Sequence, residues 1–362
     1  MHSSTNRHNV GSLLLAAVLF LTIPGNESAT HGSLRHADPP KGSLVQGGKP
    51  NDAPLRWKGL IGEYALAGDT IYVLEKDQQL HLLTKTTELY RLREQSGLKF
   101  SVDGRAFRND TTIVFRQTTG GRAEGFLVTA GEFRRASAGG ENGSTFKIKP
   151  LKPVTILKRD ALNATPPKEE GEFLSHNLVE VTSIDSTIKL DIRYATTNNF
   201  MSAIFYSLPK AFLQRPAAEA LVRAHRSLRE RGYGLLIFDA YRPWYVTKMF
   251  WDATPSDKKI FVADPLKGSR HNRGCAVDLS LYELDSGKPV EMVSGYDEFS
   301  DRAFPQYQGG TSLQRWHREL LRKAMEAEGF NVYDWEWWHF DYRDWKRYSI
   351  GTKTFDELRS FR

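Results

Sequence analysis

The sequence contains a single cysteine, Cys275, among its 362 residues. One thiol cannot form an internal disulfide, so the folded chain must be stabilised by its buried apolar cores. Cys275 stands between Gly274 and Ala276. We interpret it as a small buried side chain rather than as a ligand or a nucleophile, because unpaired cysteines are most often buried in this way.

Signatures of several large enzyme classes are also missing. The sequence has no P-loop, no Gly-x-Gly-x-x-Gly fingerprint and no Gly-x-Ser-x-Gly elbow, which argues against P-loop NTPases, dinucleotide-binding domains and α/β-hydrolases. Long runs of like charge are lacking too, since 50 basic and 43 acidic side chains are interspersed and give a net charge of +7. Because the basic residues form no cluster, we expect no nucleic-acid partner.

An apolar run extends from Val10 to Ile23 near the N-terminus. It is shorter than the roughly 20 residues that a membrane-spanning helix needs, and its basic and small-residue flanks are typical of a secretory signal peptide. We therefore predict a signal peptide over residues 1–29, with an uncleaved anchor as the alternative, and a flexible linker over residues 30–56. The protein is expected to be exported, periplasmic or extracellular, with no stable membrane span after cleavage.

Short segments of strand-forming residues follow one another from residue 57 to residue 157, separated by turns. This spacing predicts a small antiparallel β-barrel or sandwich. The segment resembles the β-barrel accessory domain of some β-lactamase-like serine hydrolases through Gly62-Glu63-Tyr64, the run from Tyr72 to Asp77, and Leu89-Tyr90-Arg91-Leu92. The resemblance implies an accessory domain without catalytic residues; a ligand-binding cavity inside the barrel is the alternative.

A polar linker predicted over residues 158–174 leads into a predicted catalytic domain over residues 175–362. Strand patterns occupy residues 188–192, 235–238 and 330–333, and helical patterns occupy residues 216–231 and 312–328. Ser312 is the expected N-cap of the second helix. We predict an α+β fold in which an antiparallel sheet carries helices on one face.

Two short segments hold most of the side chains that could do chemistry, residues 269–278 and residues 336–339. They suit a catalytic zinc with His271, Asp278 and His339 as ligands and Glu336 as the base, because such a site keeps three protein ligands and one open position. Each segment alone also fits a structural role, either as an ordinary turn or as a tryptophan-rich core strand with its polar side chains in solvent.

Residues three positions apart on a regular strand point to opposite faces. Glu336 and His339 could not then reach the same metal ion. We therefore predict that the strand twists, bulges or ends at this point, as strands next to active sites often do.

The C-terminal half, from about Leu190 to His339, resembles the D-alanyl-D-alanine dipeptidases, zinc peptidases related to the D,D-carboxypeptidases and to the zinc-binding fold of hedgehog signalling domains. Four motifs in the order of the family carry this resemblance: Arg193-Tyr-Ala-Thr-x-x-Asn-Phe200, Asp239-Ala-Tyr-Arg-Pro243, Ser269-x-His-x-x-Gly-x-Ala-x-Asp278 and Glu336-Trp-Trp-His339.

Carried over to the matching positions, the resemblance implies roles for individual residues. It implies one Zn²⁺ per chain, bound by His271, Asp278 and His339. It implies Glu336 as the general base and Arg242 as the group that stabilises the tetrahedral intermediate. It implies substrate binding by Tyr194, Ser269 and Asp297. We interpret Asp239 as the residue that orients Arg242.

The expected reaction is zinc-dependent hydrolysis of a small D,D-dipeptide, D-alanyl-D-alanine, to free D-alanine. Because export would bring the enzyme outside the cytoplasm, we expect it to act in the turnover of peptides from cell-wall peptidoglycan. Two alternatives stay open: a D,D-carboxypeptidase acting on longer stem peptides, and a non-catalytic zinc-bearing module that binds the wall. The sequence leaves the oligomeric state open.

Overall fold

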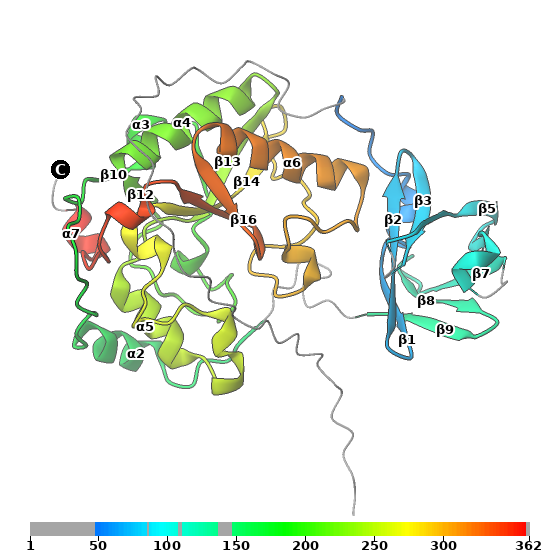
Figure 1. The fold of residues 1–362 in the computed structure, drawn as a ribbon, viewed down its shortest axis with the longest axis horizontal. Helices are drawn as coiled ribbons and strands as arrows, with labels where there is room; N and C mark the ends of the chain where they lie inside the picture. Colours follow the sequence, from blue (N-terminus) through cyan, green and yellow to red (C-terminus); the bar gives the residue numbers. More distant parts are fainter. Residues whose placement is uncertain (1–47, 85–86, 108–110, 137–146, 360–362) are drawn as a thin grey trace, which may run out of the picture. The chain divides into compact units, whose positions relative to one another are not determined.

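The computed structural model describes residues 48–84, 87–107, 111–136 and 147–359. The predicted signal peptide and most of the linker that was predicted over residues 30–56 lie outside the described residues. The fold is mixed α+β, with two large sheets (Figure 1). Within the described ranges, no helix has the length and apolar character needed to cross a membrane.

The first sheet contains nine antiparallel strands in the order β4-β3-β2-β1-β9-β8-β7-β6-β5. The strands are β1 (Gly62–Leu66), β2 (Asp69–Lys76), β3 (Gln79–Leu83), β4 (Leu89–Arg91), β5 (Arg93–Ser96), β6 (Lys99–Ser101), β7 (Thr112–Gln117), β8 (Ala123–Val128) and β9 (Gly131–Arg135). The two edge strands, β4 and β5, are separated by one residue, Leu92, whose N–H donates to the carbonyl of Leu80 at 2.8 Å. The sheet is therefore curled until it is nearly barrel-shaped.

The interior of this nine-stranded sheet is filled by its own side chains. Tyr64, Phe115 and Phe126 are at most 2% exposed, and the rings of Tyr64 and Phe126 lie 5.2 Å apart. Interdigitated aromatic rings of this kind bury large apolar areas. Aromatic packing therefore fills this part of the barrel interior.

The second sheet contains five strands in the order β11-β13-β14-β16-β15. They are β11 (Lys189–Leu190), β13 (Tyr233–Asp239), β14 (Ala276–Glu283), β16 (Glu336–Tyr342) and β15 (Phe330–Tyr333). The sheet is antiparallel, as predicted, except at one pair, because β11 runs parallel to β13. The chain between them passes through helix α4 (Arg215–Arg229), and a helical crossover of this kind is what a parallel pair requires.

Helices α4 and α6 (Ser312–Ala327) pack against each other and against the second sheet (Figure 1). All seven residues of β13 are buried, so both faces of the sheet are covered. Strands buried on both faces have continuous apolar runs, as in Leu235 to Phe238. Smaller elements complete this part: β10 (Leu178–Glu180), α3 (Val181–Ile184), β12 (Phe212–Gln214) and α7 (Phe355–Arg359).

The N-cap of helix α6 lies one residue before the predicted cap. Its N-cap is Thr311, not Ser312: the Thr311 hydroxyl accepts from the N–H of Gln314 at 3.1 Å. The Gln314 side chain in turn accepts from the N–H of Thr311 at 2.9 Å. This reciprocal capping box satisfies two N–H groups that a helix start otherwise leaves unpaired.

Residues Val154–Leu162 form helix α2, where the sequence suggested the end of the barrel domain and the start of a linker. Leu157 and Ala161 are each 1% exposed and belong to the core of the C-terminal part. Helix α2 packs against helix α5 (Trp244–Ala253). Apolar residues four positions apart lie on one helix face, which explains why this polar-looking segment is ordered against a core.

His225 of helix α4 is fully buried and hydrogen-bonded at both ring nitrogens. Its Nδ1 accepts from the N–H of Leu235 at 3.1 Å, so the ring proton lies on Nε2, 2.9 Å from the hydroxyl of Thr187. Burial lowers the pKa of His225 from 6.5 to about 4. Charging the ring would bring a second proton against the N–H of Leu235.

We predict that acid destabilises the protein through His225. Because the pKa is lower in the folded than in the unfolded state, the stabilisation is present above pH 6.5 and is lost as the pH falls toward 4. At pH 4.5 the loss should be roughly 2 kcal/mol. Urea unfolding of the wild type and of His225→Gln at pH 7 and pH 4.5 measures it. An equal decrease in both proteins would contradict the prediction.

Candidate functional site

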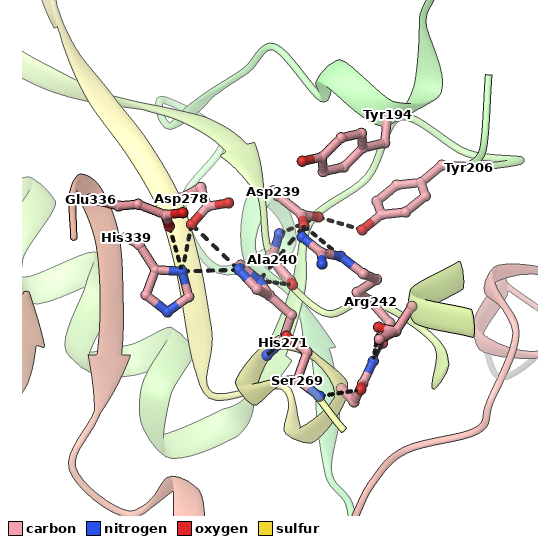
Figure 2. Close-up of polar contacts among 12 residues, drawn as sticks. Tyr194, Tyr206, Asp239, Ala240, Arg242, Ser269, His271, Asp278, Glu336 and His339 are labelled. Atoms are coloured by element: carbon pink, nitrogen blue, oxygen red, sulfur yellow. Dashed lines mark hydrogen bonds and ion pairs between the residues drawn. The ribbon is translucent and has the colours of Figure 1, made fainter. Parts of the chain in front are cut away.

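Three side chains that are far apart in sequence converge in the C-terminal part. Asp278 of β14 lies directly opposite His339 of β16 in the antiparallel ladder, and His271 lies in the short 3-10 helix η5 (Arg270–Arg273) that precedes β14. His339 Nδ1 lies 2.9 Å from Asp278 Oδ1 and 3.2 Å from His271 Nε2. Figure 2 shows the three side chains pointing toward one another.

The position of His271 is fixed by the turn around it. The Ser269 hydroxyl accepts from the N–H of His271 at 3.2 Å and caps η5. The buried Asn272 amide donates to the carbonyl of Arg242 at 2.7 Å, which joins this turn to the motif at residues 239–243. Gly274 ends the turn with φ +67°, and a Cβ at this position would approach Leu178 to 2.5 Å. The turn therefore requires glycine.

The predicted irregularity in the last strand is confirmed. Val332 of β15 pairs with Phe340, but the next residue, Tyr333, pairs with Glu336. Residues 337–339 thus have no counterpart on β15, and the strand bulges. As a result the side chains of Glu336 and His339 lie on the same side of β16, and Glu336 Oε2 is 3.8 Å from His339 Nδ1.

Outer hydrogen bonds determine where each imidazole carries its proton. His271 Nδ1 lies 2.8 Å from the carbonyl oxygen of Ala240, and His339 Nε2 lies 3.1 Å from a carboxylate oxygen of Asp341. Both partners only accept, so the protons lie on these outer nitrogens. When both rings are neutral, the inner nitrogens, His271 Nε2 and His339 Nδ1, therefore carry lone pairs that face the same point.

Asp278 completes a cluster of three acceptors. Its Oδ2 accepts from the Tyr296 hydroxyl at 2.9 Å, while its Oδ1 is buried and lacks a hydrogen-bond partner. Burial alone would raise the pKa of Asp278, but the adjacent His271 and His339 hold it well below its ordinary value. Three buried acceptors that face one point are a site for a cation, and two imidazoles with one carboxylate fit a metal ion.

Glu336 lies beside this cluster without belonging to it. Its side chain is 28% exposed, and it lines a pocket of about 530 Å³ that also contains His271, Asp278 and His339. Burial raises the pKa of Glu336, and the charge of Asp278 adds to the rise, while His339 opposes it. A carboxylate with a raised pKa beside a metal site is suited to accept and return a proton.

Arg242 is held by Asp239. Two nitrogens of the Arg242 guanidinium donate to Asp239 Oδ2, Nη2 at 2.7 Å and Nε at 3.1 Å. Asp239 Oδ1 accepts from the Tyr206 hydroxyl at 2.6 Å, so this carboxylate is fixed on both sides (Figure 2). The guanidinium of Arg242 also lies over the rings of Tyr194 and Phe250. These contacts hold one cation rigidly at the wall of the pocket.

Tyr194, Ser269 and Asp297 all line the same pocket, as the sequence resemblance implies. The Tyr194 hydroxyl donates to Asp297 Oδ2 at 3.0 Å. Asp297 has φ +55°, a conformation that non-glycine residues rarely adopt and that often occurs at functional sites. Burial raises the pKa of Asp297 well above its ordinary value, and the charges of Asp278 and Glu336 raise it further.

Three contacts of the site were not predicted from the sequence. Asp341 lies two positions after His339, and strand periodicity could have identified it as a residue on the same face. The sequence had no comparable signal for Tyr296 or Asn272. Tyr296 bonds to Asp278, 18 positions away, and Asn272 bonds to Arg242, 30 positions away. Cys275, interpreted as structural, is fully buried, and burial raises the pKa of its thiol to about 12.

Comparisons with known proteins agree with the resemblance noted in the sequence. The family model described as D-ala-D-ala dipeptidase matches residues 174–356. A D-alanyl-D-alanine dipeptidase of Escherichia coli (strain K12) is 31% identical over 164 residues, which cover 45% of this chain and 83% of that protein. The D-alanyl-D-alanine dipeptidase of Enterococcus faecium is 33% identical over 178 residues, covering 43% of this chain and 87% of the other.

We predict that metal binding releases a proton. Burial alone would lower the pKa of His339, but Asp341 and Asp278 outweigh it and raise that pKa well above its ordinary value, so a metal ion must displace a proton. Affinity for a divalent transition metal should therefore rise by up to ~10-fold per pH unit as the pH increases toward neutrality. Calorimetry in two buffers of different ionisation enthalpy counts the protons. Metal binding without release of protons would contradict the prediction. The control is His339→Ala, which lacks the imidazole that is expected to release the proton.

Proposed function

The chain belongs to the D-Ala-D-Ala dipeptidase family of metallopeptidases, and from this membership we propose that it is a zinc enzyme that hydrolyses D-alanyl-D-alanine to free D-alanine. The observation that carries the proposal is the cluster of three buried acceptors at His271, Asp278 and His339. Their chemistry fits zinc, which takes imidazole and carboxylate ligands and keeps an open position in catalytic sites. When bound, zinc lowers the pKa of water and polarises the scissile carbonyl.

Glu336 acts as the general base. It accepts a proton from the attacking water and donates that proton to the leaving amine. Its raised pKa supports this exchange, because a base works best when its pKa is close to the working pH. Its position supports the role too, since it faces the pocket and lies 3.8 Å from the inner nitrogen of His339.

Arg242 stabilises the negative charge that develops on the scissile carbonyl oxygen. Its guanidinium keeps its charge at all working pH values and offers several N–H donors. Asp239 fixes it in place before substrate arrives, so no reorganisation is needed during the reaction.

Asp297 binds the free ammonium group of the dipeptide, beside Tyr194 and Ser269. A buried carboxylate whose pKa is raised gains most from a cationic partner, because the incoming charge favours its ionised form. The pocket holds Asp297 and Glu336 together with the metal-binding cluster. A substrate with a free amine next to the scissile bond fits this arrangement.

The setting of the reaction follows from the predicted signal peptide. We propose that the enzyme is exported and acts on D,D-dipeptides released from cell-wall peptidoglycan. Under this proposal the nine-stranded sheet, residues 62–135, forms an accessory domain. Residues 175–362 form the catalytic domain together with helix α2, which packs into its core, and the proposed fold of this domain is that of the D,D-peptidases and hedgehog domains. The same export argues against a role that would require hydrolysis of cytoplasmic D-alanyl-D-alanine.

The first test combines chelation with substitution of the base. Purified protein should hydrolyse D-alanyl-D-alanine, lose activity on removal of metal and regain it with Zn²⁺. Glu336→Ala should keep zinc and lose at least ~100-fold in kcat, because general-base catalysis contributes about that much or more. Glu319→Gln, on the surface of α6, is the control and should keep full activity.

The outcomes of that test separate the alternatives. Full activity after chelation or in Glu336→Ala would overturn the mechanism. Zinc binding by the wild type without hydrolysis of any D,D-peptide would instead indicate a non-catalytic binding module.

The second test separates the dipeptidase from a D,D-carboxypeptidase. The free dipeptide should have a kcat/KM at least ~10-fold above that of an N-acylated tripeptide ending in D-alanyl-D-alanine, because acylation removes the charge that Asp297 binds. Asp297→Asn should reduce this preference. Faster cleavage of the acylated substrate would favour the carboxypeptidase.

A further inference from the structure

The Asp341 side chain lies between those of His339 and Arg270 and is not among the residues that line the pocket. It is 4% exposed. Its Oδ1 lies 3.1 Å from His339 Nε2, and its Oδ2 accepts a hydrogen bond from the guanidinium of Arg270. Each carboxylate oxygen thus has a partner of its own, and the three side chains form a continuous chain of contacts.

The backbone fixes the inner half of this chain. His339 and Asp341 are alternate residues of β16, so their side chains share one face, and Asp341 is paired on both sides, with Ala276 of β14 and Asn331 of β15. A carboxylate in this position accepts only the Nε2–H form of the His339 ring. The Nδ1 lone pair is thereby directed to Asp278 and His271.

Arg270 fixes the outer half. It immediately precedes His271 in η5, and its side chain reaches Asp341 of β16. On the way it lies over the rings of Tyr333 of β15 and of Trp345, which follows β16, with centroid distances of 5.4 and 5.0 Å. A nearly buried carboxylate stays charged only if a cation is close to it. The pair also joins the two segments that supply the histidines, since one end belongs to η5 and the other to β16.

We propose that Arg270 and Asp341 are positioning residues that set the metal affinity of the site. Arg270 holds the Asp341 carboxylate in place, and Asp341 accepts from Nε2–H of His339, so that Nδ1 is the nitrogen that faces the metal site. Asp341 is not among the residues that line the pocket, and Arg270, which does line it, acts in this role through Asp341. The inference rests on the proposed function only in taking His339 as a metal ligand.

An ion pair with a purely structural role would behave differently. Its loss would lower the unfolding free energy but leave the affinity for metal unchanged. Loss of an outer partner of a metal-bound histidine typically costs 10–100-fold in metal affinity. The two roles are therefore separated by measuring affinity and stability on the same variants.

The experiment uses the full chain and Zn²⁺ alone as the probe. Apparent zinc affinity, from competition with a chromophoric chelator, should fall ~10–100-fold in Asp341→Asn and should also fall in Arg270→Met. Arg270→Lys should recover part of that loss, because it restores the charge without the forked geometry. Unfolding of the metal-free variants is measured alongside.

The matched control is the surface ion pair between Arg223 and Glu328. Arg223→Met and Glu328→Gln should leave zinc affinity unchanged. If Asp341→Asn fails to fold, Arg270→Met decides the question, because its side chain is 39% exposed and its loss leaves no large cavity.

The outcomes distinguish this inference from the proposed function. Wild-type affinity for zinc in both Asp341→Asn and Arg270→Met, with only stability reduced, would overturn the positioning role and leave the peptidase proposal intact. Failure of the wild type itself to bind zinc would overturn both.

Discussion

Three buried electron-pair acceptors that face one another are the constraint on which the catalytic part of the molecule depends. Asp278 Oδ1 has no hydrogen-bond partner, and the inner nitrogens of His271 and His339 lie only 3.2 Å apart. Such a cluster is costly without a cation. The surroundings make it unavoidable, because Ala240, Asp341 and Tyr296 occupy the outer side of each group and leave only the inner lone pairs available.

Packing of the sheet core maintains this cluster. Asp278 lies opposite His339, and the next pair along the ladder is Val277 with Phe340, both fully buried. If the pairing register of β14 or β16 shifted by one residue, its apolar side chain would point toward the site and its metal ligand would point into the apolar core. The free energy of the apolar core therefore fixes the geometry of the polar centre, so the stability of the fold and the placement of the ligands have a common origin.

The sequence allowed prediction wherever the determining interactions are local. Residues 235–238 and 330–333 form strands, as their patterns indicated. The bulge near Glu336 followed from the alternation of side chains between the two faces of a strand. The four motifs contain His271, Asp278, Glu336 and His339, which line one pocket in the structure. The parallel pairing of β11, the helix at residues 154–162 and the contact of Tyr296 with Asp278 were not foreseen, because each depends on packing between segments that are distant in the sequence.

The bulge in β16 has a consequence for transplanting this centre into other proteins. In a regular strand, side chains that must share a face are two or four residues apart, whereas Glu336 and His339 are three apart and share a side only because residues 337–339 have no partner on β15. If the Glu-x-x-His spacing were copied onto a regular strand, the glutamate and the histidine would point to opposite faces of the sheet, and the base would be separated from the metal ligand. The unit that can be transplanted is the hairpin with its irregularity, and not the motif alone.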